Sequence, residues 1–208
     1  HEEDAPATLI AAVPLPGVGA IGVSNDGEIV EWSAEEAISA LAERPLLLCH
    51  RRFTARRAAG AAGRGGAANG KSLYPGIYDV LELFAFVRPA QFCVPTPAGL
   101  AQQVGLATPT NAEEAALTLH LIAKALLSEL QSQSYPDREE TVRMAKALMD
   151  TGWPWAPFVI SALGDLAPNS VTAARARLDI WSRLEEWEDQ PPPPPPSALP
   201  VDPDAARE

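Results

Sequence analysis

The chain has 208 residues, of which 47% are hydrophobic, and it carries a formal net charge of −11. A chain of this length can bury one sizeable core, or one core with a small helical annex, but it cannot form two full domains. The negative charge excludes binding of nucleic acid or anionic membranes by the surface as a whole, so such contacts require a local basic patch.

The composition also predicts the compartment. No run of about 18 apolar residues and no signal peptide is visible, so we expect a cytoplasmic protein without a membrane partner. The chain begins at His1 without methionine, which makes the missing targeting segment weak evidence. Cys49 and Cys93 stand in the apolar runs LLLCH and QFCVP, a pattern typical of reduced, buried thiols. A disulfide between them is the alternative.

The N-terminal region predicts three antiparallel strands. Residues 7–13 (ATLIAAV) form an apolar run that is ended by Pro14. Residues 19–32 contain two further strand-like runs on either side of Asp26 and Gly27, and an Asp-Gly pair in that position is a strong hairpin signal.

A helix, a fourth strand and a second helix follow. Ser33 and Glu36 form a capping box in front of AEEAISALAER, and Pro45 ends that helix. LLLCH, residues 46–50, is so short and apolar that it predicts a strand inside the sheet. Residues 51–59 predict the second helix.

Residues 65–72, GGAANGKS, match the phosphate-binding pattern G-x-x-x-x-G-K-[ST]. That site requires a strand before the loop and a helix that starts at the lysine, because the helix N-terminus supplies part of the anion site. An arginine- and alanine-rich stretch precedes the loop instead, and Pro75 and Gly76 stop a helix after it. We therefore expect a surface loop, and a nucleotide role for Gly65 to Ser72 stays open.

The next part of the chain predicts helices. Residues 78–89 have apolar positions at helical spacing, and residues 96–106 predict a short capped helix. Residues 111–130 form the clearest amphipathic helix, with Asn111 as its N-cap and Glu114 closing a capping box.

The last part predicts three more helices, at 137–150, 155–165 and 170–189, and then a spacer. Large aromatic side chains anchor the packing of such helices against a neighbour. Four of the five tryptophans lie in this part, namely Trp153, Trp155, Trp181 and Trp187. Residues 190–208 contain six consecutive prolines, which predict an extended spacer toward a further domain or, alternatively, a ligand for a proline-binding module.

This order of elements resembles the DnaQ-like 3′–5′ exonuclease fold, through the segments LLLCHRRFTARR, YDVLELFAFVRPAQFCVPTPAGLAQQVGL and NAEEAALTLHLIAKALL. Residues 78–106 are most similar to the N-terminal region of bacterial DinG-like ATP-dependent DNA helicases. The resemblance implies an α/β, ribonuclease-H-like domain at 1–135, in which helices flank a mixed sheet of three antiparallel strands plus parallel strands. A C-terminal helical annex at 136–189 and a proline-rich linker at 190–208 would then lead to a helicase motor.

The same resemblance implies four acidic residues that hold two metal ions, which activate water and stabilise the leaving oxygen. A D-x-E pair belongs on the first strand, but ATLIAAV has no carboxylate. The nearest pair, Asp26 and Glu28, flanks the glycine of the predicted turn. The third acid belongs after a histidine phrase, where the chain has HRRFTA from His50 onward and no acid.

Glu113 or Glu114 could supply the fourth acid, although the segment from Asn111 is better interpreted as a helix cap. We therefore expect no catalytic residue, no metal ligand and no cofactor in this chain. The alternative is an active exonuclease with a displaced ligand set, which would use Asp26, Glu28, Asp79 and Glu114.

Two histidines remain as candidates for chemistry. No acid, serine or thiol is assembled around His50, so it is interpreted as a strand-end histidine that holds a backbone group. Its neighbour Cys49 would face the opposite side of a strand. His120 has leucines on both sides and is expected to be at the helix surface or partly buried.

Arg51, Arg52, Arg56 and Arg57 form the one dense basic patch. On a helix these charges spread over more than half of the circumference, which is typical of a solvated helix in an acidic protein. The functional interpretation is a contact with the phosphates of single-stranded DNA, or a docking face for the motor or another partner.

The sequence therefore predicts a catalytically degenerate exonuclease-like domain of an ATP-dependent DNA helicase, which handles nucleic acid or serves as an interdomain scaffold. ATP and Mg²⁺ are expected only for the motor. The alternatives are an active metal-dependent 3′–5′ exonuclease and a protein-interaction module built on the tryptophan-rich helices and the proline run.

Overall fold

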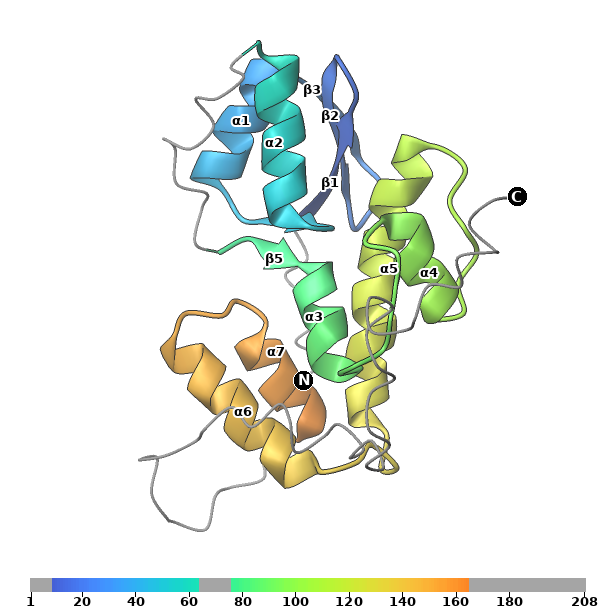
Figure 1. The fold of residues 1–208 in the computed structure, drawn as a ribbon, viewed down its shortest axis with the longest axis vertical. Coiled ribbons are helices and arrows are strands. Elements are labelled where there is room, and N and C mark those ends of the chain that lie inside the picture. Colours follow the sequence, from blue (N-terminus) through green and yellow to red (C-terminus); the bar gives the residue numbers. More distant parts are fainter. Residues whose placement is uncertain (1–8, 64–75, 165–208) are drawn as a thin grey trace, which may run out of the picture. The chain divides into compact units, whose positions relative to one another are not determined.

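The computed structural model describes residues 9–63 and 76–164, which all belong to one compact unit, His1–Leu178. A five-stranded sheet with the order β3-β2-β1-β4-β5 forms its centre (Figure 1). The strands are β1 (Ile10–Leu15), β2 (Gly19–Ser24), β3 (Ile29–Ser33), β4 (Leu46–Leu48) and β5 (Tyr78–Asp79). The first three pair antiparallel, whereas β4 pairs parallel with β1 and β5 pairs parallel with β4. This confirms the predicted mixed sheet of the ribonuclease-H-like arrangement.

The first strand extends beyond its predicted end, because Pro14 lies inside β1 and pairs with Ala20 of β2. The parallel pairing of β1 with β4 covers only Ile10 and Ala11. At Pro14 one side of β1 therefore has no neighbouring strand, and a residue without a backbone N–H is tolerated there.

The turn between β2 and β3 has the predicted hairpin chemistry. Gly27 adopts a φ of 88°, which a side chain would strain, and its N–H donates to the Ser24 carbonyl at 3.0 Å. The Asp26 carboxylate accepts a hydrogen bond from the Ser24 hydroxyl within the same turn. Asp26 thus stabilises the turn itself.

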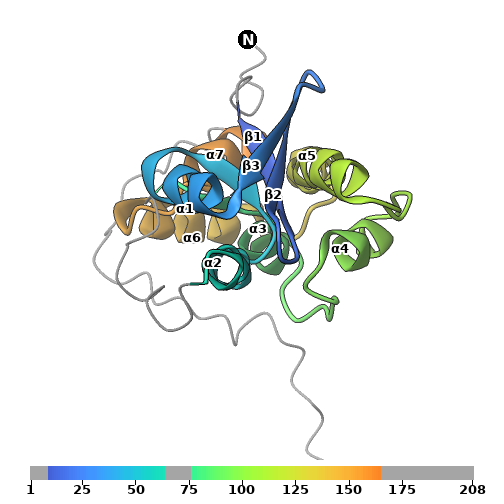
Figure 2. The ribbon, with the colours of Figure 1, turned by 90° about the horizontal axis from the view of Figure 1, so that it is seen from above.

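Helices cover both faces of the sheet (Figure 2). On one face, α1 (Ala34–Glu43) and α2 (Arg51–Ala61) pack on the strands around buried Trp32, Leu46 and Leu48. On the other face lies α5 (Ala112–Gln131), together with α3 (Val80–Val87) and α4 (Pro97–Gln103). Successive side chains of a strand point to opposite faces, so Leu47 joins the second core.

The predicted capping residues of two helices are found in place. Ser33 and Glu36 form a complete capping box at α1. At α5, Asn111 accepts from the Glu114 N–H at 2.8 Å, but the Glu114 carboxylate accepts from the backbone and hydroxyl of Thr110 at 2.8 and 2.7 Å. The box at α5 therefore closes one residue earlier than predicted.

The sequence pattern missed β5, because residues 78–89 predict a helix over their whole length. Tyr78 and Asp79 instead pair with Leu47 and Leu48, and the helix begins at Val80. A strand of two residues has no periodicity of its own, so only the tertiary pairing identifies it.

The described part of the predicted annex contains α6 (Arg138–Asp150) and α7 (Ala156–Leu163). Both helices pack into the same core cluster as α3 and α5, with Trp155 only 1% exposed. Trp155 thus anchors packing as predicted, but it does so inside the core that lies against the sheet. The predicted helix at 170–189, with Trp181 and Trp187, the linker at 190–208 and the loop at 65–72 lie outside the described residues.

Both cysteines are free thiols in the structure, Cys49 buried and Cys93 partly so. Burial raises the pKa of each thiol above its ordinary value, most strongly at Cys49. In residues 9–63 and 76–164, no helix combines the length and the apolarity that a membrane crossing would need.

Candidate functional site

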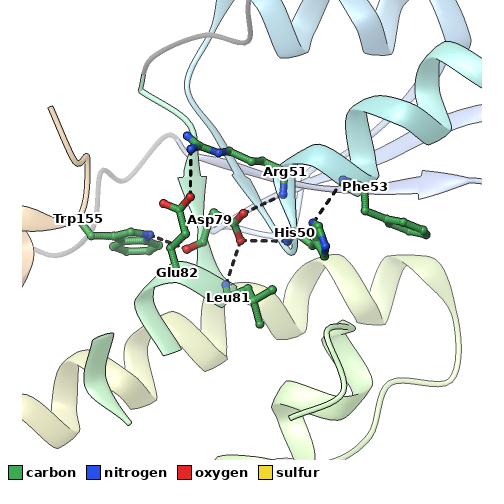
Figure 3. Close-up of polar contacts among 7 residues, drawn as sticks. All are labelled: His50, Arg51, Phe53, Asp79, Leu81, Glu82 and Trp155. Atoms are coloured by element: carbon green, nitrogen blue, oxygen red, sulfur yellow. Dashed lines mark hydrogen bonds and ion pairs between the residues drawn. The ribbon is translucent and has the colours of Figure 1, made fainter. Parts of the chain in front are cut away.

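The carboxylate of Asp79 occupies the junction of β5, α2 and α3 (Figure 3). Its Oδ1 accepts from the backbone N–H groups of His50 and Leu81, both at 3.0 Å, and its Oδ2 accepts from the Arg51 N–H at 2.8 Å. The residue is 4% exposed. One carboxylate therefore caps the first turn of two helices that are far apart in the sequence.

The backbone of Asp79 takes part in the same junction. Its carbonyl oxygen accepts a hydrogen bond of 2.9 Å from the indole nitrogen of Trp155, just before α7. The Trp155 ring packs edge-on against Tyr78, with ring centroids 5.1 Å apart. Because an unpaired indole N–H is costly in a core, this bond fixes the start of α7 against β5.

Glu82 and Arg51 form a half-buried ion pair beside Asp79, with an N–O distance of 3.2 Å. Burial raises the pKa of the Glu82 carboxyl above its ordinary value, while the positive charge of Arg51 opposes that change. The negative charge of Asp79 raises it further. Arg51 is therefore held inward by an acid, unlike the other arginines of α2.

His50 holds a backbone group at the end of β4, as predicted. It is the N-cap of α2 with a left-handed backbone (φ 60°, ψ 73°), and its Nδ1 accepts from the Phe53 N–H at 3.3 Å. His120 is partly buried, also as predicted, and its Nε2 lies 3.0 Å from the Val23 carbonyl oxygen. Each imidazole thus contacts a backbone group.

The four carboxylates of the active alternative bind to separate groups of partners. Asp26 and Glu28 belong to the β2–β3 turn, Glu114 caps α5, and Asp79 caps α2 and α3. Within the described ranges 9–63 and 76–164, no group of three or more His, Cys, Asp or Glu side chains is placed to hold a metal ion. The structure does not bring these four residues together.

The segment after β4, where the resemblance places the third acid, contains a buried threonine instead. Thr54 is 2% exposed, and its hydroxyl donates to the Cys49 carbonyl at 3.3 Å. Ala58, one turn later, is also buried in the core beneath α2. These two residues define the inner side of the helix, and Arg52, Arg56 and Arg57 lie toward solvent.

The outer side of α2 carries three of the four arginines. Arg52, Arg56 and Arg57 are exposed and make no ion pair with any described residue. The Arg57 guanidinium lies 5.3 Å from the centroid of the Phe53 ring, which is itself 47% exposed. The four basic residues spread over more than half of the helix circumference, as predicted, but Arg51 pairs with Glu82 and only the other three lie on the exposed side.

Sequence reasoning did not assign a role to Phe53 or Glu82, and it predicted Trp155 as a packing anchor without its bond to Asp79. The sequence patterns identify Phe53 only as part of a family phrase, although Thr54 and Ala58 mark the opposite helix face as buried. Glu82 and Trp155 have no local signal, because their partners are contributed by elements distant in the chain.

No protein-family model, no curated protein and no solved structure matches the chain.

Proposed function

We propose that this chain is a nuclease-like domain without nuclease activity that handles nucleic acid within an ATP-dependent DNA helicase. The observation that carries the proposal is the use of Asp79, the one buried charged residue among the described positions. A carboxylate offers about four acceptor sites. Three of them are taken by backbone N–H groups, so little capacity is left for a metal ion.

Two further observations support the absence of catalysis. The central strand β1, IAAVPL, carries no acid on either face, although the resemblance places a D-x-E pair there. After β4, His50 caps a helix and Thr54 bonds to the backbone. A two-metal mechanism needs several carboxylates at one point, because water alone holds the ions too weakly.

The nucleic-acid role is supported by the basic face of α2. Three exposed guanidinium groups, which form no ion pair with any described residue, make a local positive patch on a protein of net charge −11. Such a patch is what phosphate contacts require. The helicase motor, with its ATP and Mg²⁺, enters the proposal through the resemblance of residues 78–106.

A nuclease assay tests the catalytic half of the proposal. The purified chain is incubated with 3′-labelled single-stranded DNA and Mn²⁺, and we expect the substrate to keep its length. Progressive shortening from the 3′ end that requires Mn²⁺ would establish the active exonuclease instead.

A binding assay tests the nucleic-acid half. Fluorescence anisotropy of a labelled oligonucleotide is measured at about 50 mM and about 200 mM salt, between which phosphate-dominated binding falls steeply. We expect binding at the lower salt that weakens at the higher one. If the chain does not bind at the lower salt, the protein-interaction module becomes the favoured function. Trp155 is buried, so it would not belong to the interaction surface of that module.

A further inference from the structure

The exposed side of α2 combines charge with an aromatic ring. Arg52 and Arg56 are one turn apart, and Phe53 and Arg57 form the adjacent row. Gly60 continues the first row, and apart from its chain neighbours and the helix backbone no described heavy atom lies within 4 Å of the position that a Cβ would occupy there. The helix itself contains no acidic residue.

Phe53 has no core to pack in, since 47% of its surface is exposed. Its ring is flanked by the His50 imidazole, with centroids 6.0 Å apart, and by the Arg57 guanidinium at 5.3 Å. Figure 3 shows the ring pointing away from the Asp79 junction. An aromatic ring held at the surface beside guanidinium groups is the arrangement on which unpaired bases stack.

Resting on the function proposed above, we propose that the face formed by Arg52, Phe53, Arg56 and Arg57 binds single-stranded nucleic acid. Phe53 stacks on one base, and the three guanidinium groups contact the flanking phosphates. Arg51 takes no part, because its guanidinium pairs with Glu82. Bases in a duplex are already stacked on each other, so the Phe53 ring has no free base face to contact there.

The neighbouring helix limits the affinity. α1 packs against α2 and carries Glu35, Glu36 and Glu43, whose charges oppose an approaching phosphate chain. Binding is therefore expected to be weak at physiological salt and measurable at low salt, where the arginine contacts gain most from counterion release.

The test separates base stacking from phosphate contact. The full chain and its Phe53→Ala variant are titrated with a single-stranded oligonucleotide of about 12 nucleotides, with an abasic strand of the same length and with a duplex. We expect Phe53→Ala to lose about tenfold in affinity for the base-bearing strand, in line with the usual contribution of one stacked base. Its affinity for the abasic strand stays within about twofold of that of the parent chain.

Two variants keep the result interpretable. Phe92→Ala truncates another phenylalanine, 84% exposed and outside α2, and should leave binding unchanged. Phe53→Trp retains a stacking surface and should bind at least as tightly as the parent chain. Urea unfolding midpoints confirm that each variant is folded.

The outcomes distinguish this inference from the function on which it rests. If the chain binds the strand but Phe53→Ala has no effect, or weakens the abasic strand equally, stacking on Phe53 is wrong while nucleic-acid handling stands. Equal affinity for duplex and single strand also contradicts the inference. If no form of the chain binds at low salt, the proposed function itself fails.

Discussion

Two regions around α2 place charge in opposite environments. At its inner end, Asp79 is buried, accepts three backbone hydrogen bonds and lies beside the Arg51–Glu82 pair. On its outer side, Arg52 and Arg56 face solvent and form no ion pair with any described residue. The charges of the first region are paired with other groups of the protein, whereas those of the second are open to contact with a ligand.

The comparison separates structural from functional roles for similar residues. A buried charge that is satisfied in every direction stabilises the fold, and its removal leaves partners unpaired. An exposed arginine contributes little to stability and can be changed at small cost. Substitutions in the buried region should therefore lower stability with little effect on binding. Substitutions on the exposed side should weaken binding with little effect on stability.

Asp79→Ala is expected to have the largest effect. It leaves the His50, Arg51 and Leu81 N–H groups without their acceptor at 3.0 Å or less. Each unsatisfied buried donor costs about 1–3 kcal/mol, so we expect a loss of about 3 kcal/mol or more in urea unfolding. Asp79→Asn keeps the shape but turns an amide donor toward these N–H groups, and should also destabilise. A loss below about 0.5 kcal/mol for both variants would contradict the assigned role.

The next largest effect is expected on the outer face, in binding rather than stability. Replacing Arg52, Arg56 and Arg57 together by glutamine should reduce the salt dependence of single-strand binding. The slope of log K against log salt should fall by about 2, at roughly 0.7 for each phosphate that is no longer neutralised. Lys124→Gln, on an exposed position of α5, is the matched control and should not change the slope. An unchanged slope in the triple variant would place binding elsewhere.

A single pair of substitutions sharpens the contrast further. Arg51→Gln removes the partner of Glu82 and should lower stability by up to about 1 kcal/mol, with little effect on binding. Arg52→Gln, one residue later, should weaken binding and leave stability nearly unchanged. Unfolding curves and anisotropy titrations of both variants check this, and equal effects of the two on binding would remove the distinction.

The smallest effect concerns pH. Because the pKa of Glu82 is raised in the folded state, the folded protein holds its proton more tightly than the unfolded chain does. The Glu82 contribution to stability is therefore largest below its ordinary value of 4.5 and decreases as pH rises through the folded value. The facing groups are Arg51, Arg52, Asp79 and Trp153. The free energy of unfolding of Glu82→Gln, measured against that of the parent chain from below pH 4.5 upward, should lack this decrease. Identical pH profiles of the two chains would contradict the role of Glu82.

Local signals in the sequence predicted most of the sheet and the helix caps. The Asp-Gly turn, the Ser33 capping box and the apolar strand predicted at 46–50 each depend on residues adjacent in the chain, and each is found in the structure, the strand as Leu46–Leu48. The Pro14 boundary was wrong because the tolerance of a proline depends on which strand lies beside it.

The site depends on long-range pairing, so less of it was predictable. The sequence indicates Asp79 as a possible metal ligand, but its role as a cap follows only from the pairing of β5 with β4. The spread of the four arginines around α2 was predicted, but the separation of Arg51 from the other three was not. The small buried side chains of Thr54 and Ala58 could have identified its outer side, but the partner of Arg51 could not be identified from the sequence.

The position of Asp79 also has a kinetic consequence. Two of its three carboxylate bonds join residues 28 and 29 positions apart in the chain, and the bond from Trp155 to its carbonyl spans 76 positions. Closing such loops costs entropy before any hydrogen bond forms, so these contacts belong to a late stage of folding. Contacts that form after the transition state of folding mainly affect the unfolding rate. Loss of the Asp79 carboxylate should thus accelerate unfolding and leave the refolding rate nearly unchanged.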